Sequence, residues 1–316
     1  MKILANDGID QVGKKMLEEA GFTVDTNNIP QDQLKDRLNE YDAITVRSAT
    51  KIRKELIDAC SNIKLIGRGG VGMDNIDVEY ARSKGIAVVN TPAASSLSVA
   101  ELVFAHFFSG VRFLQDSNRE MPVKGDTAFN ELKKNYAKGI ELRGKTLGIL
   151  GFGRIGREAA KIAYGLGMNI MAYDLFDFNP ETELVFADNQ SIKFKVQIAT
   201  KEEVLKNADF ITLHVPAVDG KAVIAAEELS MMKKGASLVN CARGGVVDEL
   251  ALIESLNAGH ISFAGLDVFD NEPCPQKAIL SHPKLSLSPH IGAATNEAQE
   301  RIGVELAQRI IQELKK

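Results

Sequence analysis

The chain has 316 residues, a length that predicts about two domains. Hydrophobic residues make up 45% and charged residues 25% of the sequence, as in ordinary globular proteins with a sizeable core. The formal net charge is −4 and the isoelectric point is near 5.8. This balance argues against a nucleic-acid-binding domain and against a polybasic membrane anchor.

The sequence predicts neither a targeting segment nor a membrane span. Its first residues lack the apolar core of a signal peptide. The most apolar stretch, residues 102–111, is interrupted by polar residues and is shorter than the roughly 20 residues that a span needs. Cys60, Cys241 and Cys274 are few, odd in number and far apart, which argues against a disulfide framework or a metal motif. We therefore expect a cytoplasmic protein without a metal site.

The first part of the chain alternates strand-like and helix-like segments. The predicted strands are residues 2–5, 22–24, 43–46, 64–67 and 86–89. The predicted helices between them are residues 11–20, 31–38, 51–59 and 75–84. The alternation predicts an open parallel sheet covered by helices, and five strands are typical of a flavodoxin-like unit.

A change of pattern follows at Pro92. Ser98 and Glu101 have the spacing of a capping box, which predicts a helix from residue 98 to about residue 114. Residues 116–140 are polar and interrupted by proline and glycine, so we expect irregular structure there.

A second alternation begins at Lys145. The predicted strands are residues 146–150, 169–173, 196–198, 210–215, 237–240, 263–268 and 285–287, and the predicted helices include residues 155–166, 248–258 and 296–314. The fold class is therefore α/β, with two doubly wound parallel-sheet domains.

A glycine motif opens the second block. Gly151, Gly153 and Gly156 form a G-x-G-x-x-G between a predicted strand and an alanine-rich helix, the context in which this motif binds a dinucleotide. Asp174 ends the next strand, where a carboxylate accepts hydrogen bonds from ribose hydroxyls and repels a 2′-phosphate. The pattern predicts NAD rather than NADP. The alternative is a set of structural turn glycines with an exposed aspartate.

Three later strands each end in a loop with a chemically useful residue: Arg243 in a glycine-rich loop, Glu272 before a proline, and His290 before a helix. Loops at the carboxyl ends of strands converge in an open α/β sheet. An arginine binds a carboxylate, a histidine moves a proton, and a glutamate fixes the histidine tautomer. Taken singly, each residue could equally be a surface ion-pair, loop or packing residue.

The other histidines give weaker signals. His106 is expected to pack on its helix, whereas His260 and His282 are expected in loops. His214 ends a strand before Pro216, where it could line a cofactor crevice.

Together these segments resemble the D-isomer-specific 2-hydroxyacid dehydrogenases over essentially the whole chain. The resemblance is carried by residues 148–156 (GILGFGRIG), 240–249 (NCARGGVVDE), 267–273 (DVFDNEP) and 288–292 (SPHIG). It implies hydride transfer with NAD, in which Arg243, Glu272 and His290 form the catalytic trio. It also implies a flavodoxin-like substrate domain, residues 1–95 plus 288–316, around an inserted Rossmann NAD-binding domain, residues 96–287.

The resemblance also implies binding residues. The expected cofactor contacts are Gly151, Gly153, Arg154, Ile155, Gly156, Asp174, His214, Pro216, Cys241, Ala242, Asp267 and Gly292. The expected substrate contacts are Arg47, Arg68, Gly70, Val71 and Gly72, with the last three offering backbone N–H groups to a carboxylate. Lys134 and Lys138 are weaker candidates for a phosphate.

Residues 46–51 (VRSATK), 67–72 (GRGGVG) and 96–101 (SLSVAE) are most similar to family members that oxidise a phosphorylated 2-hydroxy acid. The alternatives are reduction of glyoxylate or hydroxypyruvate, oxidation of D-lactate, or an NAD-sensing binding protein without turnover. The resemblance also implies a homodimer formed through residues 98–136.

Two departures from the family pattern concern the chain's end and one loop. The sequence stops at Lys316, so we expect neither a C-terminal regulatory domain nor feedback inhibition through one. After Pro216 the family usually has threonines, whereas this chain has residues 217–221 (AVDGK), which puts the nicotinamide contacts there in question.

Overall fold

The structure is a computed structural model that describes residues 1–217 and 221–315. The chain divides into two compact units, Met1–Ser98 with Ala293–Lys316 and Val99–Gly292. Residues 96–98 thus group with the first unit and residues 288–292 with the second, unlike the predicted boundaries. Local bonds give the reason, since Ser98 Oγ lies 2.9 Å from Thr295 Oγ1, whereas Gly292 N–H donates to Asp267 at 2.8 Å.

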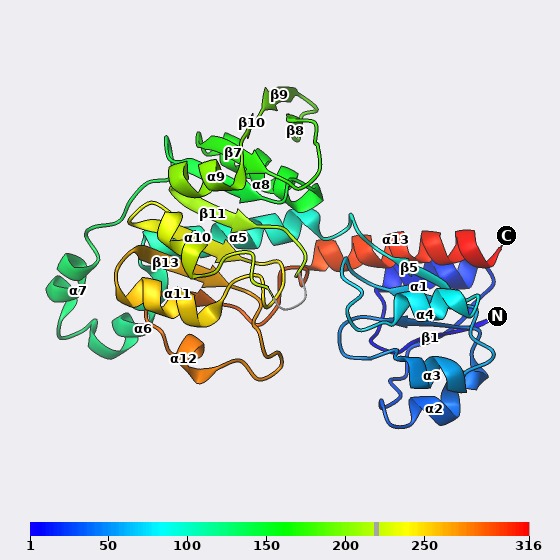
Figure 1. Ribbon diagram of the computed structural model, residues 1–316. Helices are drawn as coiled ribbons and strands as arrows, with labels where there is room; N and C mark the ends of the chain where they lie inside the picture. Colours follow the sequence, from blue (N-terminus) through cyan, green and yellow to red (C-terminus); the bar gives the residue numbers. More distant parts are fainter. Residues whose placement is uncertain (218–220, 316) are drawn as a thin grey trace. The chain divides into compact units, whose positions relative to one another are not determined.

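The first unit is built on a five-stranded parallel sheet (Figure 1). Its strands are β1 (Lys2–Ala5), β2 (Thr23–Asp25), β3 (Ala43–Val46), β4 (Leu65–Arg68) and β5 (Ala87–Asn90), in the order β2-β1-β3-β4-β5. This is the doubly wound order of flavodoxin-like folds, as predicted. Its helices are α1 (Gln11–Glu19), α2 (Leu34–Arg37), α3 (Lys54–Ala59), α4 (Val78–Ser83) and α13 (Asn296–Leu314), with a 3₁₀ turn at Leu38–Glu40.

The C-terminal helix α13 completes the first unit. Leu306 and Ile310 of this helix are buried in one cluster with Ile3 and Leu65 of the sheet. Helices α1 and α13 meet at two glycines, because a Cβ added to Gly13 would lie 2.5 Å from the backbone carbonyl of Gly303. The two glycines therefore permit the close packing that joins the two ends of the chain in one core.

The second unit contains a seven-stranded parallel sheet in the order β10-β7-β6-β11-β12-β13-β14. The strands are β6 (Thr146–Leu150), β7 (Asn169–Tyr173), β10 (Gln197–Ile198), β11 (Phe210–Leu213), β12 (Ala236–Asn240), β13 (Ile261–Leu266) and β14 (Leu285–Leu287). The first six follow the Rossmann order 3-2-1-4-5-6. The helices are α5 (Ser96–Val111), α6 (Leu114–Lys124), α7 (Phe129–Asn135), α8 (Arg154–Gly165), α9 (Lys201–Asn207), α10 (Ala226–Met231), α11 (Glu249–Asn257) and α12 (Lys277–Leu280).

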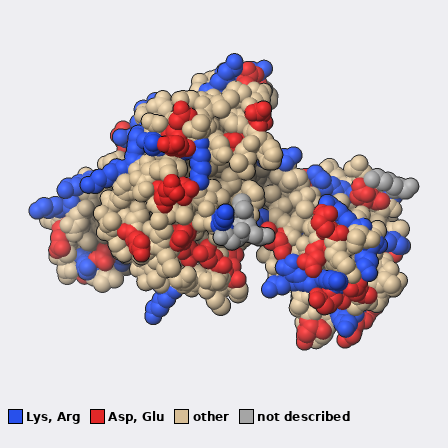
Figure 2. Space-filling view, in the orientation of Figure 1, with Lys and Arg blue, Asp and Glu red and all other residues tan. Residues whose placement is uncertain are grey.

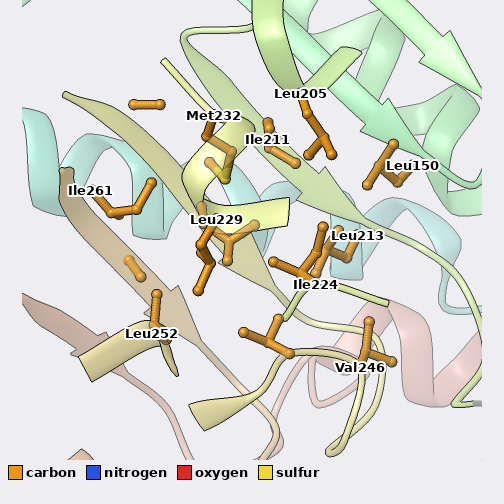
Figure 3. Close-up of a cluster of buried hydrophobic side chains, with 14 of the residues drawn as sticks. Leu150, Leu205, Ile211, Leu213, Ile224, Leu229, Met232, Val246, Leu252 and Ile261 are labelled. Atoms are coloured by element: carbon orange, nitrogen blue, oxygen red, sulfur yellow. The ribbon is translucent and has the colours of Figure 1, made fainter. Parts of the chain in front are cut away.

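Both faces of the second sheet are covered. Figure 3 shows one of the two buried clusters, in which Ile211 and Leu213 of β11 pack with Leu229 and Leu252 of the covering helices. Every residue of β11 and β12 is buried. Such continuous burial is expected for parallel strands between two helical layers.

The segment expected to be irregular is helical. Residues 116–140 contain most of α6 and all of α7 (Phe129–Asn135). Pro122 sits late in α6 and removes one intrahelical bond, yet the helix continues until Gly125, whose N–H bonds to Met121 O. The side chain of Gln115 anchors α6 to Leu285 O.

One further local prediction was wrong, and one element was missed. Helix α5 begins at Ser96 rather than at Ser98, because the Ser98 hydroxyl bonds to Thr295 instead of capping the helix. An antiparallel hairpin, β8 (Glu181–Val185) with β9 (Ser191–Lys195), was not predicted. It covers α8 through Phe194, whose ring stacks on Tyr164 at 4.2 Å between centroids.

Among the described helices, no single one is long and apolar enough to cross a membrane. Helices α5 and α6, which form a bent pair, together have the length and the apolar composition of a membrane span.

Candidate active site

The glycine motif lies between β6 and α8, as predicted. Gly151 has φ +96°, and an added Cβ would lie 2.5 Å from His214 O. A Cβ on Gly156 would lie 2.3 Å from Gly151 O, whereas one on Gly153 would meet nothing within 4 Å. Gly151 and Gly156 therefore permit the tight turn, and Gly153 leaves open space beside the N-terminus of α8. Arg154 and Ile155 form the first turn of that helix. An open helix N-terminus of this kind fits a pyrophosphate.

Asp174 follows β7 and lies beside this loop. One carboxylate oxygen accepts a hydrogen bond from Phe152 N at 2.7 Å, and the other accepts from Phe176 N at 3.3 Å. The side chain is half-buried. A fixed negative charge in this position fits ribose hydroxyls and opposes a 2′-phosphate.

Two neighbouring strand ends hold other predicted cofactor contacts. His214 Nε2 lies 3.1 Å from Thr212 Oγ1, and Nδ1 is buried with no hydrogen-bond partner within the described residues. Burial lowers the pKa of His214 to about 3, so the ring is neutral. Burial likewise raises the pKa of Cys241 well above its usual value, which makes that thiol unreactive. Ala242 N–H is held by Asn240 Oδ1 at 3.0 Å.

Pro216 is exposed after β11. The departure predicted at residues 217–221 falls largely on Val218, Asp219 and Gly220, which lie outside the described residues.

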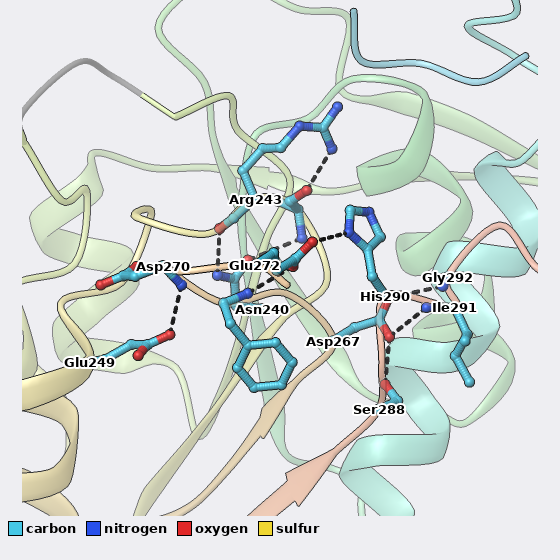
Figure 4. A network of polar contacts seen from close by, with 12 residues as sticks. Asn240, Arg243, Glu249, Asp267, Asp270, Glu272, Ser288, His290, Ile291 and Gly292 are labelled. Atoms are coloured by element: carbon cyan, nitrogen blue, oxygen red, sulfur yellow. Dashed lines mark hydrogen bonds and ion pairs between the residues drawn. The ribbon is translucent and has the colours of Figure 1, made fainter. Parts of the chain in front are cut away.

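Glu272 and His290 are brought together although eighteen residues separate them in the chain. Glu272 Oε2 lies 2.8 Å from His290 Nδ1, and Glu272 Oε1 accepts from Phe269 N at 3.0 Å (Figure 4). The two side chains remain 35% and 45% exposed. A carboxylate on Nδ1 holds the proton there and leaves Nε2 as the basic nitrogen, which is the arrangement of a general base.

Arg243 lies on the loop that contacts the Glu272 loop. Gly245 N–H donates to Asp270 Oδ1 at 2.6 Å, and a Cβ added to Gly244 would lie only 2.0 Å from Phe269 O. The Arg243 guanidinium donates to Ala242 O at 2.6 Å (Figure 4). The three predicted catalytic residues thus come from three adjoining loops at the carboxyl edge of one sheet.

A buried carboxyl group supports these loops. Glu249, the first residue of α11, accepts from Asp270 N at 2.9 Å through Oε1. Its Oε2 is buried without a hydrogen-bond partner in the described part of the chain. Burial raises the pKa of Glu249, because the charged form loses its hydration. Sequence reasoning did not identify this residue.

Asp267 and Gly292, both expected at the cofactor, bind each other. Asp267 is only 1% exposed, and its carboxylate accepts from Ser288 Oγ at 2.6 Å and from the N–H groups of Ile291 and Gly292 at 2.8 Å each. Between these residues His290 has φ +55°, an unusual backbone conformation for a residue other than glycine. Asp267 therefore holds the loop that carries His290.

The predicted substrate residues of the first unit lie at the ends of β3 and β4. Arg47 N–H donates to Asp7 Oδ2 at 2.7 Å, and burial lowers the pKa of the Arg47 guanidinium. Arg47 and Asp7 line a cavity of about 270 Å³ together with Gly69 and Gln299. The cavity lies beside β1 and β3, the switch point of this strand order, where doubly wound sheets bind ligands.

The remaining candidates do not line this cavity. Gly70 has φ +142°, and an added Cβ would lie 1.5 Å from Arg68 Nη1, so the guanidinium packs directly on the glycine. Val71 and Gly72 follow in the same loop. Lys134 and Lys138 are exposed in and after α7, in a region where Figure 2 shows many basic side chains at the surface.

Comparison with known proteins identifies the family of the chain. Residues 104–292 match the profile of the NAD-binding domain of the D-isomer-specific 2-hydroxyacid dehydrogenases. The hydroxypyruvate reductase of Thermotoga maritima is 39% identical over 318 residues, which are 99% of this chain and 98% of that protein. The chain belongs to the D-isomer-specific 2-hydroxyacid dehydrogenases. The members of this family are NAD-dependent oxidoreductases, and the chain is therefore one of them.

Other relatives fit the same family. The D-3-phosphoglycerate dehydrogenase of Methanocaldococcus jannaschii is 40% identical over 311 residues, which are 98% of this chain but 57% of that protein. The chain therefore spans little more than half the length of this relative. The crystal structure of a glyoxylate reductase from Paecilomyes thermophila matches with a TM-score of 0.83 at 29% identity, covering 100% of this chain and 96% of that one.

Within the described residues, no group of three or more histidine, cysteine or acidic side chains could hold a metal ion. The glycine loop with its open space at Gly153, the Asp174 carboxylate and the buried Nδ1 of His214 are the features that fit NAD.

Proposed function

We propose that the protein catalyses the reversible oxidation of D-3-phosphoglycerate to 3-phosphohydroxypyruvate with NAD, the first step of serine biosynthesis. The observation that carries the proposal is the 2.8 Å contact between Glu272 Oε2 and His290 Nδ1, beside the loop of Arg243. The second unit is the proposed cofactor domain and the first unit the proposed substrate domain.

Each of the three residues has one proposed role. His290 Nε2 takes the proton of the C2 hydroxyl group, while Glu272 stabilises the imidazolium that forms. Arg243 binds the substrate carboxylate through its planar guanidinium and orients C2. When bound, NAD supplies the acceptor for the hydride of C2. In the reverse direction the His290 imidazolium returns the proton to the carbonyl oxygen.

The phosphorylated substrate is supported by the two basic residues of the first unit. Arg47 and Arg68 are the proposed phosphate ligands, because a guanidinium matches the geometry of phosphate oxygens. The Gly70, Val71 and Gly72 backbone amides are the proposed partners of the substrate carboxylate. The D-3-phosphoglycerate dehydrogenase relative, at 40% identity, supports the same substrate.

Hydroxypyruvate reduction is the second candidate. It is favoured by the Thermotoga maritima relative, whose length this chain matches almost completely. In that case the Glu272–His290 pair and Arg243 keep their roles, and Arg47 and Arg68 stabilise the first unit only.

The test compares kcat/KM for phosphohydroxypyruvate, hydroxypyruvate, glyoxylate and pyruvate by the absorbance of reduced nicotinamide, with D-3-phosphoglycerate measured in the opposite direction. We expect the phosphorylated pair to be preferred, and Arg47→Ala to raise KM for it while leaving KM for hydroxypyruvate unchanged. A preference for hydroxypyruvate in the unmodified protein would instead assign the second function.

A homodimer through α5, α6 and α7 is also proposed. Leu114, Met121, Val123 and Phe129 in this region are 55%, 43%, 73% and 56% exposed, and exposed large apolar side chains are typical of surfaces that a partner covers. Val123→Glu should shift the mass measured by light scattering from dimer to monomer. A monomeric unmodified protein would overturn the proposal of a homodimer.

A cytoplasmic location stays a prediction.

A further inference from the structure

His106 is a buried histidine that lies outside the proposed catalytic trio. It belongs to α5, is 4% exposed, and packs against β13 at Gly265. A Cβ added to Gly265 would lie 2.6 Å from His106 Cβ, so the missing side chain of Gly265 leaves the space that His106 occupies. A polar ring in such a place costs free energy unless both nitrogens find partners.

Both nitrogens of His106 are hydrogen-bonded to serines around β14. Nδ1 lies 2.8 Å from Ser286 Oγ, and Nε2 lies 3.0 Å from Ser288 Oγ. The Ser288 hydroxyl is also 2.6 Å from Asp267 Oδ1, and a carboxylate can only accept. Ser288 therefore donates its single proton to Asp267 and accepts from His106 Nε2–H.

These hydrogen bonds fix the tautomer of His106. With the proton on Nε2, Nδ1 accepts from the Ser286 hydroxyl, and every group in the chain of bonds is satisfied. Burial lowers the pKa of His106, which keeps the ring in this neutral form.

The same chain of bonds ends at the loop of His290. Asp267, the next group after Ser288, accepts from Ile291 N and Gly292 N, the two residues that follow His290. Ser288 itself stands two residues before His290. The loop is thus tied on both sides of a residue whose φ is +55° and whose Nδ1 meets Glu272 at 2.8 Å.

We propose that His106 is a positioning residue for the general base: through Ser288 and Asp267 it fixes the 288–292 loop and so the direction of the His290 imidazole. This rests on the role of His290 proposed above. His106 touches neither Glu272 nor His290 in this chain of bonds, so its effect is on orientation rather than on the proton transfer itself. A misdirected imidazole lowers turnover without removing the reacting group.

The test uses two substitutions of His106 and one control. His106→Phe fills the space but has no nitrogen, whereas His106→Gln keeps a donor and an acceptor near the positions of the two ring nitrogens. Phe107→Leu is the control, because Phe107 is a fully buried neighbour on α5 whose side chain takes no part in the hydrogen bonds from His106 to Asp267. For each variant kcat, KM and melting temperature are measured.

We expect His106→Phe to lower kcat about tenfold, equivalent to about 1.4 kcal/mol, because the buried serine hydroxyls lose their partner. His106→Gln should restore most of kcat, and KM for NAD should change little in either variant. Phe107→Leu should lower the melting temperature and leave kcat unchanged. Full kcat in His106→Phe, or an equal loss of kcat in Phe107→Leu, would overturn the proposal.

Ser288→Ala provides an independent variant should His106→Phe fail to fold, since it removes one hydroxyl only. It should lower kcat to a similar extent, and the double variant of Ser288→Ala with His106→Phe, where it folds, should be no worse than either single variant. Additive losses would contradict a single chain of bonds. The nitrogen NMR shifts of His106 should report a proton on Nε2, and a proton on Nδ1 would refute the chain directly.

Failure of this inference can be separated from failure of the proposed function. His290→Ala tests the general base by itself. Loss of turnover in His290→Ala with full kcat in His106→Phe would overturn only the positioning role. Retained turnover in His290→Ala would overturn the assignment of the base on which both depend.

Discussion

Asp267→Asn is the substitution for which the structure gives the most direct expectation. The Asp267 carboxylate accepts three hydrogen bonds while 1% exposed, from Ser288 Oγ on Oδ1, Ile291 N on Oδ1 and Gly292 N on Oδ2. Asparagine has one acceptor oxygen. If that oxygen takes the place of Oδ1, the new amide NH₂ faces the Gly292 N–H, which is now 2.8 Å from a second donor.

The cost follows from the bonds that change. One bond to a charged acceptor is lost, at about 1.5 to 3 kcal/mol, and the two remaining bonds weaken because their acceptor becomes neutral. We therefore expect the free energy of unfolding to fall by about 3 kcal/mol. Because the same bonds hold His290 at φ +55°, kcat should fall at least tenfold as well.

The assay measures denaturant unfolding and kcat on the same preparations, with Asp209→Asn as the matched control. Asp209 also holds a backbone amide, Thr146 N at 2.9 Å, but it lies at the start of β11, far along the strand from the catalytic loops. The control should lose stability and keep kcat. An Asp267→Asn variant with normal kcat and an unchanged unfolding midpoint would show that these hydrogen bonds do not hold the His290 loop.

Three further predictions concern single residues. Burial raises the pKa of Glu249 in the folded protein, so its stabilising contribution is complete below the unfolded pKa and is lost as the pH rises through the folded pKa. The free energy of unfolding of Glu249→Gln relative to the unmodified protein should therefore rise as the pH increases through the folded pKa, and a pH-independent difference would contradict this. Gly244→Ala should lower kcat/KM at least tenfold in a steady-state assay, because the added Cβ would lie 2.0 Å from Phe269 O and must push the Arg243 loop away from the Glu272 loop. A fully active variant would show that the two loops adjust freely. Asp174→Ala should lower the ratio of kcat/KM for NAD to that for NADP, and an unchanged ratio would remove the carboxylate from cofactor selection.

The parts of the fold that were predictable carry local signals. Parallel strands buried on both faces appear as short apolar runs, and the glycine motif stands between such a run and a helix. Arg243, Glu272 and His290 each follow an apolar strand, so the rule that strand ends converge was sufficient to group them.

The parts that were missed depend on contacts between distant residues or on weak local patterns. His106 lies 180 residues from Ser286, and no local pattern shows that a helical histidine meets a strand serine. Pro122 predicts a break in the helix, although α6 tolerates it near its end. In the hairpin of β8 and β9 only residues 191–195 (SIKFK) alternate polar and apolar side chains, whereas residues 181–185 (ETELV) do not, so the sequence gives a signal for just one of the two strands.

His290, oriented by Glu272, is the proposed general base of this NAD-dependent 2-hydroxyacid dehydrogenase. The most direct measurement is the turnover of D-3-phosphoglycerate and of hydroxypyruvate by His290→Ala, together with the dissociation constant of NAD. We expect kcat to fall by roughly 10² to 10⁴ for whichever substrate the unmodified enzyme uses, with NAD binding unchanged. Turnover close to that of the unmodified enzyme would contradict the account.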